Sequence, residues 1–132
     1  MKRCRLTITT IADGVETAIT REGKMKLALS EAELLYREEC AQVLIRLRNS
    51  TAEMVRVGDY NLHLHLQEGM QTSGSIGIGG SDGEIQTFAR RVAYSISQDA
   101  LLLSLQYDLI ISGERQKMKL RLLSRFEEEY ED

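Results

Sequence analysis

A β-hairpin within residues 100–124 constrains what this chain can fold into more than any other stretch of it. On both sides of a glycine, large apolar residues alternate with polar ones, which is typical of strands that bury one face. We predict a two-residue type II′ turn at Gly113 and Glu114, because that turn prefers glycine at its first position. In the resulting register the large apolar side chains share one face. The predicted pairs are Leu109 with Met118, Tyr107 with Leu120 and Leu105 with Leu122.

The same alternation, interrupted by short turns, marks the start of the chain and the strand before this hairpin. Asp13 and Gly14 are a strong signal for a tight hairpin turn, and a second turn is predicted at residues 98–99. The predicted pairs are Ile8 with Ile19 and Thr10 with Thr17 around the first turn, and Ile96 with Leu101, Tyr94 with Leu103 and Val92 with Leu105 around the second.

The middle of the chain alternates in the same way. A three-residue loop at 49–51 and a turn at 58–59 would bring the apolar faces of its strands together. The predicted pairs are Ile45 with Val55, Val57 with Tyr60 and Val55 with Leu62. Residues 30–41 fit two interpretations. A capping-box pattern at Ser30 and Glu33 favours a short helix, whereas the strands on either side favour a strand, which is the interpretation we prefer.

Roughly eight to ten strands of ordinary length account for the whole chain, and short turns join nearly all of them. A meander of this length with one apolar face would leave two open edges and an uncovered core. Closure into a barrel removes both problems, so we predict an all-β fold, a closed antiparallel up-and-down β-barrel. The prediction is one barrel domain over residues 1–126 and an acidic C-terminal tail over residues 127–132.

The charge balance excludes several classes of function. The chain has 17 lysines and arginines against 20 aspartates and glutamates, a net charge of −3, whereas nucleic acids and anionic membranes are bound by basic surfaces. We therefore expect no nucleic-acid partner and no membrane partner. Two cysteines, Cys4 and Cys40, are too few for a disulfide framework or a zinc-site spacing. No segment has the length of a transmembrane helix, and we expect a cytoplasmic protein.

Two motifs invite functional interpretations that their surroundings do not support. Residues 74–83 hold half of the ten glycines, but they lack the spacing of a phosphate-binding loop and no helix pattern follows them. A bent strand with a tight turn at 81–83 fits better. His63 and His65 share one strand face, yet zinc requires a third protein ligand that the local pairing does not supply. We predict no metal and no cofactor.

The candidate ligand-binding residues are Arg90, Tyr94 and Tyr107. Arg90 is in phase with the apolar residues of its strand, and the hairpin register sets it opposite Tyr107. An arginine inside a barrel could anchor the carboxylate or phosphate of a ligand; alternatively, its head group reaches water at the barrel rim. The sequence contains no nucleophile with a base and no paired carboxylates that stand out, so we predict that the protein is not an enzyme.

The sequence resembles the YwiB-like proteins of bacteria, a family of unknown function with a calycin-like (lipocalin-like) β-barrel. The resemblance covers essentially the whole chain and is strongest in LQEGMQTSGSIGIGGSDGEIQTFARRVAYSISQDALLLSLQYDLIISGERQKMKLRLLSR, and LTITTIADGVETAITREGKM also fits. It implies that residues 34–38 form a strand. Calycins hold small hydrophobic ligands inside the barrel, although this chain lacks the tryptophan of the lipocalin GxW signature and the Arg-x-Tyr carboxylate anchor.

Two hypotheses for function follow. The first is a bacterial protein that binds a small apolar or amphipathic ligand inside the barrel without catalysis. The second is a protein-interaction or structural module whose barrel is filled by its own side chains. A homodimer is one form of this hypothesis. A dimer or partner surface would use the apolar residues that the pattern places on the outer face, which are Leu44, Leu102, Ile110 and Leu123.

Overall fold

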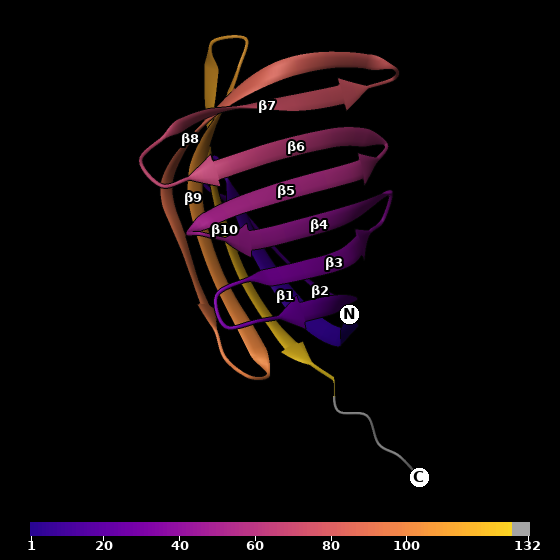
Figure 1. Ribbon diagram of the computed structural model, residues 1–132. Coiled ribbons are helices and arrows are strands. Elements are labelled where there is room, and N and C mark those ends of the chain that lie inside the picture. The colour runs from indigo at the N-terminus through magenta and orange to yellow at the C-terminus, as the bar shows by residue number, and fades with distance from the viewer. Residues whose placement is uncertain (128–132) are drawn as a thin grey trace.

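The computed structural model describes residues 1–127 and shows an all-β chain, which confirms the predicted fold class. Over that range the strands close into one barrel in which consecutive strands are antiparallel neighbours, and β1 completes the ring by pairing with β10 (Figure 1). The strands are β1 (Lys2–Ala12), β2 (Val15–Leu27), β3 (Ala32–Glu38), β4 (Ala41–Arg48), β5 (Thr51–Gly58), β6 (Tyr60–Gln67), β7 (Gln71–Ile78), β8 (Ser81–Ile96), β9 (Ala100–Ile111) and β10 (Glu114–Phe126).

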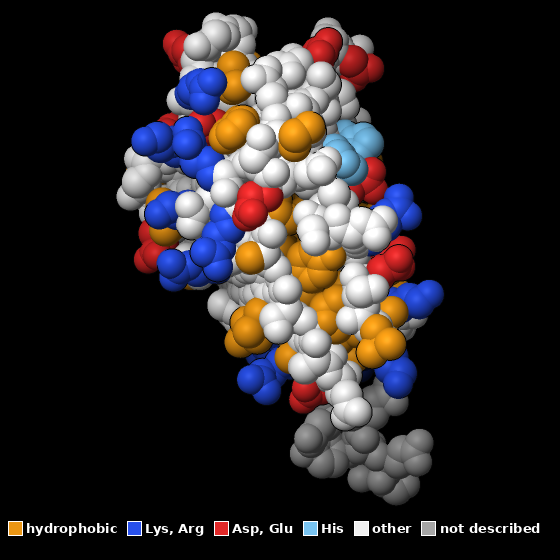
Figure 2. Space-filling model, turned by 60° about the vertical axis from the view of Figure 1, so that its left-hand side comes forward, with side chains coloured by type: hydrophobic (Ala, Val, Ile, Leu, Met, Phe, Trp, Pro, Cys, Tyr) orange, Lys and Arg blue, Asp and Glu red, His pale blue; other side chains and the backbone are white. Residues whose placement is uncertain are grey.

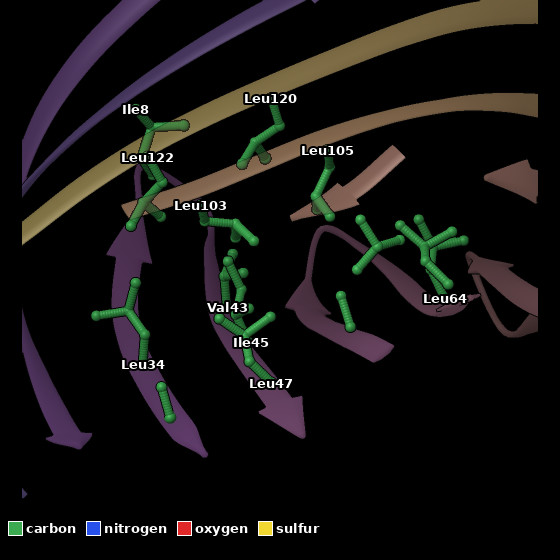
Figure 3. Packing of buried hydrophobic residues seen from close by; sticks show 14 of the residues in the cluster. Ile8, Leu34, Val43, Ile45, Leu47, Leu64, Leu103, Leu105, Leu120 and Leu122 are labelled. Atoms are coloured by element: carbon green, nitrogen blue, oxygen red, sulfur yellow. The ribbon is translucent and has the colours of Figure 1, made fainter. Parts of the chain in front are cut away.

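The core lies between two groups of strands that differ in length. Strands β3 to β7 have 7 or 8 residues each, whereas β8, β9 and β10 have 12 to 16. Figure 1 shows the short strands running across the long ones. Side chains from both groups meet in the interior (Figure 3), where Ile45, Leu64 and Leu105 are completely buried. The alternation in the sequence therefore supplies one continuous apolar core.

Several sequence predictions are confirmed at the level of individual residue pairs. The first hairpin turns at Asp13 and Gly14, both with positive φ, and has the predicted register. The hairpin of β8 and β9 also pairs as predicted from Val92 to Ile96. Residues 30–41 contain strand β3 and no helix, because this segment bridges β2 and β4 in the sheet.

The register of the β9–β10 hairpin differs by two residues from the prediction. The turn consists of Ser112 and Gly113, with φ values of 50° and 81°, so the glycine occupies the second position of a type I′-like turn and not the first of a type II′ turn. A shift by two keeps every side chain on its predicted face. The observed pairs are Tyr107 with Met118, Leu105 with Leu120 and Leu103 with Leu122.

The predicted registers of β4 with β5 and of β5 with β6 are each wrong by one residue. A shift by one residue moves side chains to the opposite face of the sheet. Only Asn49 and Ser50 separate β4 from β5, again with positive φ, where a three-residue loop was predicted. The alternation of β5 is therefore inverted, so Ala52 and Met54 face the core and Val57 is exposed. The observed pairs are Ile45 with Met54, Val55 with His63 and Arg56 with Leu62.

The predicted tail at 127–132 lies, apart from Glu127, outside the described residues. Within residues 1–127, no helix has the length and apolarity that a membrane crossing requires.

Candidate functional site

Arg90 lies at a β-bulge and points away from the barrel interior. The predicted position of Arg90, inside the barrel and opposite Tyr107, is therefore wrong. The ladder between β8 and β9 pairs Ala89 with Tyr107 and Arg91 with Gln106, so Arg90 is the extra residue of the bulge. A bulge reverses the alternation of a strand: Ala89 is buried before it and Val92 after it. The Arg90 side chain is 51% exposed, as in the alternative interpretation of a head group that reaches water.

The partner of Arg90 is the carboxylate of Asp108 on the outer face of β9. Arg90 donates from Nη2 at 2.8 Å and from Nε at 3.4 Å, and Arg115 donates from Nη1 at 3.0 Å. Only 2% of the Asp108 side chain is exposed. The hydrogen bond from Arg90, followed by that from Arg115, holds the pKa of Asp108 below its ordinary value although burial opposes this. Arg90 therefore belongs to an ion-pair cluster with Asp108 and Arg115.

The two predicted tyrosines do not join that cluster: Tyr107 is next to Asp108 in the chain and borders the same hollow as Arg90, but it is buried in the core, and Tyr94 lies elsewhere on β8. Tyr107 belongs to the apolar core, where burial raises its pKa to about 12. The Tyr94 hydroxyl accepts a hydrogen bond from the backbone N–H of Ser50 at 3.1 Å and so joins β8 to the turn between β4 and β5. The structure thus does not assemble Arg90, Tyr94 and Tyr107 into one interior anchor.

An interior arginine exists, but it is Arg56, which the sequence analysis missed. The inverted phase of β5 turns it inward, and its side chain is only 12% exposed. Its guanidinium donates to Glu38 at 3.3 Å, and to Asp59 and the Tyr60 carbonyl at 2.7 Å each. It also stacks over the Tyr60 ring, 3.7 Å from the centroid. These partners engage Nε and Nη1 of Arg56, so its charge is already paired with the carboxylates of Glu38 and Asp59.

A large hollow lies on the outer face of the sheet formed by β1, β10, β9 and β8. We call it the outer groove; its volume is about 570 Å³. Its apolar part includes the cross-strand pair Leu102 and Leu123, which are 54% and 38% exposed. Arg91 and Arg121 come from strands on either side of β9. The lining residues are Thr7, Thr9, Arg91, Ala93, Tyr94, Ser95, Leu102, Leu103, Ser104, Arg121, Leu122 and Leu123.

The sequence pattern identified part of this groove. It placed Leu102 and Leu123 on the outer face, where both are exposed, while Leu44 and Ile110 from the same prediction are half-buried. Arg91 was not singled out, although the predicted phase, with Val92 and Tyr94 pointing inward, already places it on the outer face. Of the predicted site residues, only Tyr94 borders the groove.

The histidines and glycines lie on a different part of the outer surface. His63 contacts Glu53 at 3.0 Å, and this contact holds the pKa of the Glu53 carboxyl below its ordinary value. No group of three or more potential metal ligands occurs within residues 1–127. The glycine-rich segment forms the β7–β8 hairpin, whose turn is at Gly79 and Gly80 and not at 81–83 as predicted. Both glycines have the positive φ that such a turn requires.

Comparison with known proteins agrees with this architecture. The family model described as "Domain of unknown function (DUF1934)" matches residues 3–122. The fold is similar to the crystal structure of the ywiB protein from Bacillus subtilis, with a TM-score of 0.82 and 13% sequence identity over 96% of this chain and 93% of that chain. The predicted resemblance to YwiB-like proteins is thereby confirmed. A comparison with curated proteins found no match.

Proposed function

Because the chain belongs to the DUF1934 family, a domain of unknown function, we infer its function from its own geometry and propose that it is a non-catalytic binding protein for an amphipathic anion. The observation that carries this proposal is the outer groove, in which exposed leucines lie beside two arginines. An apolar ligand body would cover Leu102 and Leu123, and an acidic head group would lie between Arg91 and Arg121.

We place this ligand on the outer face because buried apolar side chains from both groups of strands pack together in the interior. Most of the hollows lie on the outer surface or between neighbouring strands, one lies at an end of the barrel beside Leu29, Ser50 and Tyr94, and the leucines of the core pack against one another (Figure 3). In the groove, the strands that carry Arg91 and Arg121 are two positions apart in the sheet, about 10 Å. The two residues are also offset along β9, where Arg91 is opposite Gln106 and Arg121 opposite Ser104. Both side chains are long, so a carboxylate or phosphate between them suits this arrangement.

The test is a calorimetric titration with dodecanoate, used below the concentration at which it forms micelles. We expect the wild-type protein to bind it, and Arg121→Glu and Leu123→Asp to weaken binding by about tenfold each. The matched controls are Arg48→Glu and Val15→Asp, which change an exposed arginine and an exposed apolar residue outside the groove. Absence of dodecanoate binding, or equal loss in the controls, would contradict the proposal.

The exposed pair Leu102 and Leu123 also favours a second candidate, an interaction module that associates with another copy of itself. Two leucines with 54% and 38% exposure on adjacent strands form an apolar contact that a two-fold axis can duplicate. Light scattering after size exclusion distinguishes the candidates: a dimer that Leu123→Asp converts to a monomer favours self-association, whereas a wild-type monomer excludes it at that concentration.

A further inference from the structure

The outer face of β10 forms a row of basic residues that extends well beyond the outer groove. Every outward position from 115 to 125 except Leu123 carries a lysine or an arginine, and all of these side chains are exposed. We call Lys117, Lys119, Arg121 and Arg125 the basic row. In Figure 2, lysine and arginine side chains gather along the left of the molecule, and others lie along its right below the histidines. An acidic chain thus has one strongly basic strand face.

The neighbours of the basic row leave its charge largely uncompensated. On β9, the residues paired with Lys119, Arg121 and Arg125 are Gln106, Ser104 and Ala100. On β1, the residues paired with the same three are Ile11, Thr9 and Arg5. Two acids adjoin Lys117: Asp108, whose carboxylate already receives Arg90 and Arg115, and Asp13, whose carboxylate accepts the backbone N–H of Lys117. Within residues 1–127, no ion pair joins the basic row to a carboxylate.

We propose that the basic row and Leu123 bind an extended acidic segment of a partner polypeptide lying along β10. Outward residues of a strand repeat about every 6.6–6.8 Å, and alternate side chains of an extended peptide have the same repeat. Carboxylates at alternate positions can therefore meet successive cations of the basic row. At Leu123 the basic row has no cation, and Leu102 is its neighbour on β9. An apolar side chain of the peptide would contact these two leucines. The preferred pattern along the peptide is one acid, one apolar residue and three acids, each separated by one residue.

The chemistry of this face favours a peptide over a nucleic acid. Single-stranded nucleic acids are held by aromatic side chains on which bases stack, but the outward positions of β1, β9 and β10 carry no aromatic residue. Phe88 on β8 is only half-buried but lies beneath Arg90, 5.6 Å from its guanidinium. The exposed leucine pair offers nothing to a phosphate backbone, whereas it suits an apolar side chain.

This inference rests on the proposed binding function, because it shares Arg121 and Leu123 with the outer groove. It adds Lys117, Lys119 and Arg125, none of which lines the groove. The two proposals can therefore fail separately. Charge reversal at Lys117 and Lys119 addresses the peptide alone, and dodecanoate addresses the groove alone.

The experiment measures fluorescence anisotropy of a fluorescein-labelled peptide, Glu-Ser-Leu-Ser-Glu-Ser-Glu-Ser-Glu, and of the reversed sequence, since β10 does not fix the direction. We expect the double variant Lys117→Glu with Lys119→Glu to weaken the tighter peptide by about tenfold or more and to leave dodecanoate binding unchanged. The matched control is Lys24→Glu with Lys26→Glu, which reverses two exposed charges at the same spacing on β2 and should leave peptide binding unchanged.

A measurement on the wild-type protein removes any dependence on how the variants fold. Because the basic row is exposed, peptide affinity should fall as salt is added. The inference is overturned if neither peptide binds, if the Lys117 and Lys119 variant binds as tightly as wild type, or if salt has no effect. It is also overturned if a 15-nucleotide oligothymidylate or vesicles containing phosphatidylserine bind to the basic row more tightly than the peptide. Failure of dodecanoate alone would count against the groove and not against the peptide.

Discussion

At the scale of single residues, Asp108 is the acid whose replacement should be most informative. Its carboxylate is buried on the outer face of β9 beneath Arg90 and Arg115. Asp108→Asn removes the charge that both arginines contact, and we expect the free energy of unfolding at pH 7 to fall by about 1–2 kcal/mol. The loss is no larger because both arginines are exposed and are hydrated when the ion pair is removed. Urea denaturation measures the difference, with the exposed Asp82→Asn as the control that should change little.

The pH dependence of that difference follows from the direction of the pKa shift. The pKa of Asp108 is lowered in the folded protein, chiefly by the hydrogen bond from Arg90. Its contribution to stability is therefore complete above the ordinary pKa of a carboxyl group and is lost as the pH falls through the lowered value. The gap between wild type and Asp108→Asn should be largest near neutral pH and shrink in acid; a gap that grows in acid would contradict the ion-pair assignment.

The contrast between Arg90 and Arg56 shows where sequence reasoning fails at this scale. Phase along a strand predicts which face a residue occupies only while the ladder is regular. The bulge at Arg90 and the two-residue turn before β5 each change the phase by one. As a result the arginine predicted inside lies outside, and the one inside, Arg56, was missed. Neither event is marked by alternation, because a bulge inserts a residue without breaking the apolar pattern on either side.

At the scale of strands and turns, the β9–β10 hairpin depends on Gly113. Its φ of 81° lies in the left-handed region, where a side chain raises the backbone energy by about 1–2 kcal/mol. Gly113→Ala should therefore lower the free energy of unfolding by about 1 kcal/mol in urea denaturation. The matched control is Gly83→Ala, where φ is not left-handed and an added methyl group meets Ile76 at an ordinary 3.9 Å. Equal losses in both variants would show that the turn conformation is not responsible.

The turn between β4 and β5 offers the opposite test. Ser50 adopts a φ of 59° without being glycine, and its side chain is exposed. Ser50→Gly creates the Asn-Gly pair that type I′ turns prefer, and it should raise the free energy of unfolding by about 0.5 kcal/mol, since relief of strain exceeds the added freedom of the unfolded chain. Thermal unfolding by circular dichroism is the readout. A lower midpoint would mean that the Ser50 conformation carries no strain.

The residues in the turns also explain which features of the fold could be predicted from the sequence. Asp13 and Gly14 determine both the position and the register of their hairpin, and that register is confirmed. Asn49 and Ser50 carry a weaker signal, since serine rarely adopts positive φ, and the loop was predicted one residue too long. Strand number, antiparallel order and closure survive such errors because they depend on the total apolar alternation. The outer groove does not, because the contact between Leu102 and Leu123 depends on the register of the β9–β10 hairpin, which was predicted two residues out.

At the scale of the whole molecule, net charge is a poor guide to what the surface can bind. The chain is acidic overall, with a net charge of −3, and on that basis nucleic acids and anionic membranes were not expected as partners. The period of two places the basic residues of β10 on one outer face, so the local field there has the opposite sign to the average. Net charge therefore predicts long-range association. The binding of a short acidic segment depends instead on the charges of the surface that it contacts.

Whether the barrel interior holds a ligand or only its own side chains is decided by how tightly the core is packed. Leu105 is completely buried between the two groups of strands. If the interior is filled, Leu105→Ala leaves a cavity that the surroundings cannot close, and the free energy of unfolding should fall by about 2–5 kcal/mol. Leu29→Ala, at a fully exposed leucine, should change it by less than about 0.5 kcal/mol. A cost below about 1 kcal/mol for Leu105→Ala would mean that the interior is slack, and would return the binding site from the outer groove to the inside of the barrel.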